Sequence, residues 1–200
     1  MSDRFGRHLT LIPIKCVIFH TKDSCRIRKP GLYMKASNSN GITQHHNSRF
    51  IIMFHVVLYE PEIPDNTGAV GRTCVAVDAK LWLVQPLGFH LDHKRIRRAG
   101  LDYWQHLNWE LAANYADLQQ KIGDRRYWFF TKNAVQSYTE VQYAPEDVFV
   151  FGSESQGLPP SVIAANSDHC LRIPMRPEAR SLNLSVSVAV VLYEAKRQIR

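Results

Sequence analysis

The chain has 200 residues, which suits one α/β domain with a sizeable core and leaves too little length for a second full domain. Its formal net charge is +7 at pH 7, and residues 1–52 hold nine Lys and Arg against two Asp, so the whole excess lies in this leader. Residues 53–200 hold sixteen basic and sixteen acidic residues, which excludes a global positive field and requires that any nucleic acid be bound by a local patch.

The leader, residues 1–52, shows no sustained helix or strand period, and we expect it to be poorly ordered. Its longest apolar stretch, Leu9 to Phe19, is interrupted by Pro13 and Lys15 and lacks a small-residue cleavage site, which argues against a signal peptide. Two alternatives stay open: an upstream start codon adds the leader ahead of a natural start at Met53, or the leader is a basic arm that binds RNA.

The rest of the chain, residues 53–200, is expected to form one domain of alternating strands and helices. Phe54 to Tyr59 is a compact apolar strand, and Asp65 and Asn66 are suitable N-cap residues for the helix that follows. That helix has Val70, Cys74 and Val77 on its apolar side. Further strands are expected at Leu81–Val84, Tyr127–Thr131 and Val148–Phe151, and helical composition is found at Trp109–Ile122. This alternation predicts an α/β fold with a mainly parallel sheet.

The last segment has two possible periods. Alternate residues from Leu184 to Val190 are apolar as in a strand, whereas Val188, Val191, Leu192 and Ala195 have helical spacing. The length from Asn183 to Arg200 favours a helix, with Asn183 or Ser185 as its cap.

No stretch approaches the roughly 20 apolar residues of a membrane helix, and the four cysteines show no spacing typical of a zinc site. We therefore expect a cytoplasmic protein with no membrane contact and no bound metal.

Three motifs follow the predicted strands, where open parallel sheets bind their ligands. The first, Pro64–Arg72, contains two glycines and has Arg72 nearly two turns beyond Asn66; a capped helix with a solvated Arg is the plain alternative. The second, Phe151–Pro159, is a Gly-rich turn that lacks both the Walker pattern and GxGxxG, which argues against a dinucleotide-dependent dehydrogenase. The third joins Ile173–Met175 to Arg180–Ser185, where apolar side chains could flank an aromatic base and polar ones could bind it.

Together, in this order, the motifs resemble the signature motifs of the SPOUT superfamily of RNA methyltransferases. The similarity covers Phe54 to Gln198 and is specific to the small subfamily that 2′-O-methylates the wobble nucleotide, position 34, of certain tRNAs on cytidine or modified uridine. Val57–Pro64 and Arg97–Tyr103 also look like that subfamily. The resemblance implies helices on both faces of the sheet, a deep C-terminal trefoil knot, a homodimer, and the anticodon stem-loop of tRNA as the partner.

The resemblance also implies site residues for the cofactor S-adenosylmethionine, with no metal. The cofactor-binding residues would be Phe130, Thr131, Gly152, Gly157, Leu158, Ile173, Met175, Ser181, Leu182 and Asn183. The catalytic set would be Arg72, Asn66, Glu154, Asn183 and Tyr193. In this set Arg72 would meet the ribose hydroxyl or a phosphate, Glu154 and Asn183 would hold the motif loops, and Tyr193 would position substrate. The general base is left open, because an Arg normally stays protonated. Ala69 and Gly71 depart from the first motif, where a polar and a bulkier apolar residue are common.

Lys94, Arg95, Arg97 and Arg98 form the densest basic run of residues 53–200, and Tyr103 follows it. Phosphate contacts from this run, with aromatic stacking nearby, suit an anticodon loop, while a solvated helix face is the alternative. The other functional reading is a non-catalytic RNA-binding protein that retains the SPOUT fold.

Overall fold

The structure is a computed structural model that describes residues 54–90 and 102–199. The leader and the basic run of Lys94, Arg95, Arg97 and Arg98 lie outside these residues, so the expectations for both stay predictions.

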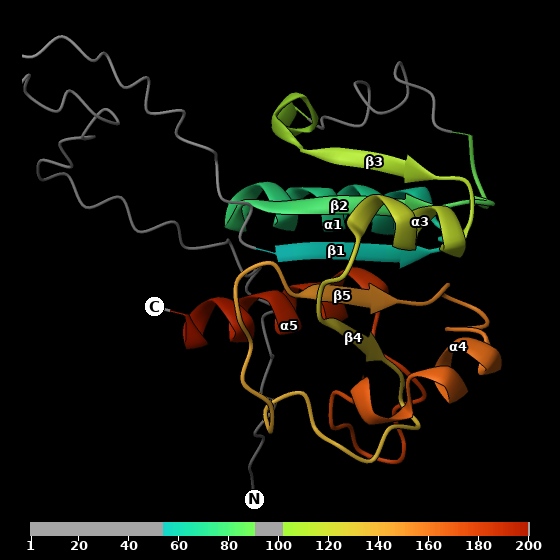
Figure 1. The fold of residues 1–200 in the computed structure, drawn as a ribbon, viewed down its shortest axis with the longest axis vertical. Helices are drawn as coiled ribbons and strands as arrows, with labels where there is room; N and C mark the ends of the chain where they lie inside the picture. Colours follow the sequence, from blue (N-terminus) through green and yellow to red (C-terminus); the bar gives the residue numbers. More distant parts are fainter. Residues whose placement is uncertain (1–53, 91–101, 200) are drawn as a thin grey trace, which may run out of the picture. The chain divides into compact units, whose positions relative to one another are not determined.

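The centre of the fold is a six-stranded sheet in which every strand pairing is parallel. In spatial order, the strands are β3 (Trp109–Ala112), β2 (Ala79–Val84), β1 (Phe54–Tyr59), β5 (Val148–Phe151), β4 (Tyr127–Phe130) and β6 (Cys170–Leu171) (Figure 1). β1 lies in the middle, with Val57 opposite Trp82 of β2 on one side and Val150 of β5 on the other. The predicted parallel sheet is confirmed.

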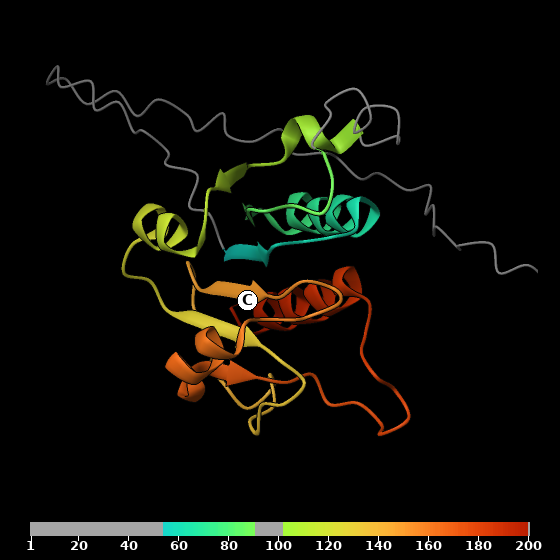
Figure 2. The same ribbon diagram turned by 90° about the vertical axis from the view of Figure 1, so that its right-hand side faces the viewer.

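Helices cover both faces of the sheet, as expected. On one face, α1 (Pro64–Val77) and α5 (Leu184–Gln198) pack on Phe54, Val56 and Phe149. On the other face, α3 (Tyr115–Ile122) and α4 (Pro160–Ala165) pack near Val57 and Val150, and the two pairs lie on opposite sides in Figure 2. The central strands are buried on both faces, which explains why their sequences are continuous apolar runs and do not alternate.

Two local expectations are wrong. The first helix does not begin after Asp65 or Asn66: Ile63 is its N-cap, without a side-chain cap bond, and Pro64 is its first residue. The fixed φ of proline suits the first helical position, so the helix starts earlier than the polar residues suggested.

The second error is the helical assignment of Trp109–Ile122. Its first four residues form β3, which pairs with β2, and α3 begins only at Tyr115, after Asn114 accepts a hydrogen bond from Asp117 N at 2.9 Å. Pairing with a neighbouring strand overrode the helical composition of this short stretch.

The last helix is confirmed. Asn183 is its N-cap, and the Oδ1 atom of Asn183 accepts hydrogen bonds from the backbone N–H groups of Ser185 and Val186 at 2.8 and 3.4 Å. Within the described residues, no helix has the length and apolar character needed to cross a membrane.

The sheet order locates the site. From β1 the sheet extends to β2 and β3 on one side and to β5, β4 and β6 on the other, so the order reverses beside β1. Open parallel sheets bind ligands at the carboxyl ends of the strands beside such a reversal.

Candidate functional site

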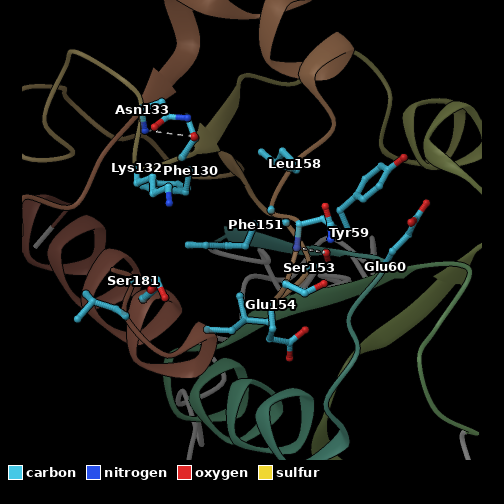
Figure 3. A pocket seen from close by; sticks show the side chains of 18 of the residues that line it. Tyr59, Glu60, Phe130, Lys132, Asn133, Phe151, Ser153, Glu154, Leu158 and Ser181 are labelled. Carbon is cyan, nitrogen blue, oxygen red and sulfur yellow. Dashed lines mark hydrogen bonds between the residues drawn. The ribbon is translucent and has the colours of Figure 1, made fainter. Parts of the chain in front are cut away.

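A cavity of about 1030 Å³ opens at the carboxyl ends of β1, β4 and β5 (Figure 3). All ten residues that the resemblance assigned to the cofactor line it: Phe130, Thr131, Gly152, Gly157, Leu158, Ile173, Met175, Ser181, Leu182 and Asn183. They come from four separate segments of the chain, and the sheet brings them to one place.

The Gly-rich loop after β5 closes on itself at the floor of the cavity. Ser153 N donates to the carbonyl of Gly157 at 3.2 Å, and Gly157 N donates to the carbonyl of Ser153 at 2.9 Å. Gly157 has a φ of 70°, a backbone conformation that residues other than glycine rarely adopt. A Cβ at Gly152 would overlap the backbone of Gly157 and Leu158, so the loop closes only because residue 152 has no side chain.

One wall of the cavity is flat and apolar. The rings of Phe130 and Phe151 stack with centroids 4.6 Å apart and planes 10° from parallel. Leu158 is buried, and Ile173 and Met175 are half-buried beside it. Such a wall, with backbone polar groups close by, is typical of sites that bind a small molecule with a planar ring.

Three polar side chains link the loop after β5 to the first turns of α1 and α5. Glu154 accepts hydrogen bonds from Glu62 N at 2.8 Å, Ile63 N at 3.3 Å and Asn66 Nδ2 at 2.9 Å. Asn66 Oδ1 in turn accepts from Asn183 Nδ2 at 2.9 Å. The carboxylate of Glu154 therefore binds the N–H group of the N-cap residue Ile63, as the acidic residue of a capping box does, and also offsets the positive end of the helix dipole.

A second carboxylate makes the reverse connection. Glu62, just before α1, accepts hydrogen bonds from Ser155 N at 3.2 Å and from Ser155 Oγ at 2.5 Å. Each of the two segments thus supplies a carboxylate that accepts hydrogen bonds from the other. We call this double link between residues 62–63 and 154–155 the carboxylate clasp. Glu154 and Asn183 lie where they can hold the motif loops in place.

We predict that Glu154→Gln lowers the free energy of unfolding by about 1–3 kcal/mol, because all three partners of the carboxylate are donors and an amide nitrogen would face at least one of them unpaired. Urea denaturation followed by circular dichroism measures the change. Gln156→Ala, at an exposed position of the same loop, is the matched control and should leave stability within about 0.5 kcal/mol of the unchanged protein. A Glu154→Gln protein as stable as that control would contradict the capping role.

Arg72 does not line this cavity. It lies farther along α1, in a second hollow of about 510 Å³ between the exposed sides of α1 and α5, and Tyr103 of η1 (Asp102–His106) shares that hollow. Tyr193, on α5, is 55% exposed and lines neither cavity. Of the expected catalytic residues, the structure therefore brings Asn66, Glu154 and Asn183 together and leaves Arg72 and Tyr193 outside their group.

The cavity is also lined by residues for which the sequence analysis predicted no role. Tyr59 is the last residue of β1 and Glu60 follows it, and Lys132 and Asn133 follow β4; all four are labelled in Figure 3. Burial and the neighbouring Glu60 carboxylate raise the pKa of Tyr59, so its hydroxyl stays protonated at neutral pH. A position directly after a strand was the one signal that could have identified them, since strand ends meet at one edge of a parallel sheet.

Among the described residues, no group of three or more His, Cys, Asp or Glu side chains could hold a metal ion. To a ligand, the described residues of this cavity offer an apolar wall, backbone polar groups and a few hydrogen-bonded side chains.

Comparison with known proteins relates this arrangement to one family. Residues 53–193 match the model of the SpoU rRNA Methylase family. A relative in Bacillus subtilis (strain 168) is 46% identical over 151 residues, which are 74% of this chain and 94% of the relative. The Escherichia coli (strain K12) protein named tRNA (cytidine(34)-2′-O)-methyltransferase is 40% identical over 148 residues, which are 74% of this chain and 94% of that protein.

A solved structure agrees with the sequence comparison. It is described as "Structural insights into the 2-OH methylation of C/U34 on tRNA", is 42% identical, and has a TM-score of 0.69 over 74% of this chain and 91% of its own. The family model spans the sheet and all three motifs, and the chain therefore belongs to the SpoU rRNA methylase family.

Proposed function

We propose that this protein transfers a methyl group from S-adenosylmethionine to the ribose 2′-hydroxyl of the wobble nucleotide, cytidine or modified uridine 34, of tRNA. The observation that carries the proposal is the single cavity lined by residues of all three motifs at the carboxyl ends of β1, β4 and β5. Relatives at 40% and 42% identity are described by this same reaction and position, which supports the choice of substrate.

The cavity fits the proposed cofactor. Its volume of about 1030 Å³ is at the upper end of ordinary ligand pockets, which leaves room beyond a cofactor for part of a substrate. The stacked Phe130–Phe151 wall with Leu158 and Ile173 would hold the adenine ring, and the backbone of the closed loop would bind the polar groups around it. When bound, S-adenosylmethionine supplies a methyl group already activated by its sulfonium.

The remaining work for the protein is to orient the ribose and to stabilise charge as the 2′-oxygen loses its proton. We assign the orienting contact to Arg72, whose guanidinium would donate to a phosphate or ribose oxygen. Alignment of reacting groups contributes up to about 7–11 kcal/mol, so orientation alone accounts for a large acceleration. Asn66, Glu154 and Asn183 act on the loops and not on the reacting atoms, and Tyr193 would contact substrate from the exposed side of α5.

The proposal includes the finer features that the resemblance implied. The segments that line the cavity after β4, β5 and β6 would be threaded as a trefoil knot. Residues 53–200 would be the methyltransferase domain, with residues 1–52 dispensable for it, and the protein would act in the cytoplasm, where its tRNA substrate is found. Lys94, Arg95, Arg97 and Arg98 would contact the anticodon stem-loop.

A homodimer is also proposed, formed through α1 and α5. Val186 and Tyr193 on α5 and Ile63 before α1 are large apolar side chains exposed by 47%, 55% and 43%. The hollow between the two helices is lined by Ala69, Val186, Ala189 and Val190 beside Arg72. A partner there would bury apolar surface and cover the surroundings of Arg72, completing an RNA site that one chain leaves open.

Val186→Asp is expected to convert this dimer to a monomer, because it would place a charge in the apolar contact, while an acidic residue in the first turn of α5 does not disturb the helix. The loss of the dimer should lower the rate of methylation, whereas S-adenosylmethionine binding should persist. Light scattering at assay concentration measures the mass. Val135→Asp, at a loop position 91% exposed, is the matched control and should stay dimeric. A monomeric, fully active protein before any substitution would refute the dimer.

The proposed function is tested with purified protein, S-adenosylmethionine and total tRNA, followed by nucleoside mass spectrometry. We expect the amount of a 2′-O-methylated pyrimidine nucleoside to rise above that in a reaction without protein, and mass spectrometry of nuclease fragments of the same tRNA should assign the gain to position 34. The competing reading is an RNA-binding protein without turnover. Calorimetry separates the two, since a pure RNA binder should give no heat with S-adenosylmethionine.

A further inference from the structure

The side chain of Arg72 lies on an aromatic ring. Its guanidinium carbon is 4.9 Å from the centroid of the Tyr103 ring, within the range of a cation–π interaction. The hydroxyl of Tyr103 donates a hydrogen bond of 2.8 Å to the carbonyl of Gly68, one turn before Arg72 on α1. The ring is therefore fixed, through its own hydroxyl, to the helix that carries the arginine.

Gly71 makes this arrangement possible. A Cβ at residue 71 would lie 2.9 Å from Trp104 Cζ3 and 3.0 Å from Leu107 Cδ2, closer than side-chain carbons normally approach. Trp104 also packs against Trp109, with ring centroids 5.7 Å apart, so a shift of Trp104 would disturb that contact as well. The bulkier apolar residue that is common at this position of the motif would push η1 away from α1 and carry Tyr103 with it.

We infer that Tyr103 is a positioning residue for Arg72, seated by the close contact between Gly71 and Trp104; the inference rests on the proposed function. Arg72 is exposed, and an unrestrained Arg side chain populates many rotamers. Most of these rotamers would leave the guanidinium out of line with the substrate. The Tyr103 ring restricts the guanidinium to one side of the second hollow. Tyr103 thus acts on the rate of methyl transfer and not on cofactor affinity.

The alternative is that Tyr103 stacks directly on an RNA base. The two roles differ in what they need from Arg72. A positioning role requires Arg72, so removing Tyr103 costs nothing further once Arg72 is gone. A stacking role is independent of Arg72, raises KM for tRNA, and persists in its absence.

Single-turnover methylation with saturating tRNA tests the inference on the intact protein. Tyr103→Leu is expected to slow methyl transfer about tenfold, because small displacements of an orienting group are costly, and Tyr103→Phe, which keeps the ring, by no more than about threefold. In the Arg72→Ala protein, Tyr103→Leu should have no further effect. S-adenosylmethionine affinity is measured in parallel and should not change, and the melting temperature should fall by only a few degrees, about the cost of the one hydrogen bond lost. A Tyr103→Leu effect of equal size with and without Arg72, or confined to KM, overturns the inference.

Gly71→Ala supplies an independent variant. It should slow methyl transfer about as much as Tyr103→Leu, and the double variant should be no slower than the slower single one. Additive losses would mean that the contact at Gly71 does not act through Tyr103.

An activity-independent readout separates this inference from the proposed function. The Nε–Hε resonance of Arg72, assigned by its disappearance in Arg72→Ala, should be shifted by the ring current of Tyr103 and should move to the position of a solvated arginine in Tyr103→Leu. A protein that methylates no tRNA but shows this shift refutes the proposed function alone. An Arg72 resonance already at the solvated position in the unchanged protein refutes the positioning role.

Discussion

Replacing Gly152 with alanine is expected to lower the affinity for S-adenosylmethionine by at least about a hundredfold, about 2.7 kcal/mol. The Cβ of the new residue would overlap the carbonyl group of Gly157 and the nitrogen of Leu158, all of them backbone atoms that no rotamer change can move aside. The Ser153–Gly157 pair of hydrogen bonds must then open. Isothermal titration calorimetry with S-adenosylmethionine measures the loss directly.

Gly157→Ala is the matched control for Gly152→Ala. A Cβ at Gly157 meets nothing within 4 Å, so the substitution causes no overlap and costs only the strain of a φ of 70°, about 1 kcal/mol. Its affinity for the cofactor should therefore fall by no more than about tenfold. If both substitutions weaken binding equally, strain and not overlap controls the loop. If neither does, the loop is not part of the cofactor site.

Arg72→Ala is expected to slow methylation at least tenfold, equivalent to about 1.4 kcal/mol in the barrier, while the cofactor affinity stays within about twofold. The separation follows from the structure, because Arg72 lines the hollow between α1 and α5 and not the cofactor cavity. Rates measured at saturating S-adenosylmethionine, with calorimetry for the cofactor, separate the two quantities.

Two controls accompany Arg72→Ala. Arg72→Lys keeps the charge but loses the planar fork, and should recover only part of the rate. Arg197→Ala removes another exposed arginine, one that pairs with Glu194 on α5, and should methylate at the unchanged rate. Wild-type turnover by the Arg72→Ala protein would remove this residue from the mechanism and leave the fold and cofactor site intact.

The parts of the fold that local sequence specifies were predictable. β1 is a run of apolar residues ended by Glu60 and Pro61, and α5 starts where Asn183 can accept hydrogen bonds from the next turn. β3 and β6 were not found, because they are edge strands of four and two residues that exist only by pairing with β2 and β4. Strand formation of that kind depends on distant partners and leaves little local signal.

The site was predictable in a similar, partial way. The second motif could be identified as a Gly-rich turn, but only the structure shows that the stricter steric demand is at Gly152 and not at Gly157. That Glu154, Asn66 and Asn183 form one chain of hydrogen bonds could not be derived from composition or period, because the bonded residues are 88 and 117 positions apart. The choice of residues for the cofactor came from the resemblance, and the structure shows that they share one cavity.

The carboxylate clasp has a consequence for biosynthesis. A nascent chain that has emerged only through Ser155 contains both carboxylates of the clasp, yet it still lacks Asn183, the third motif and α5. Since long-range pairings of this kind form late and slowly, the cavity is assembled last in folding. Under the proposed function, S-adenosylmethionine would therefore bind only chains that have been translated and folded through α5, and by mass action it would protect those finished molecules from unfolding and proteolysis.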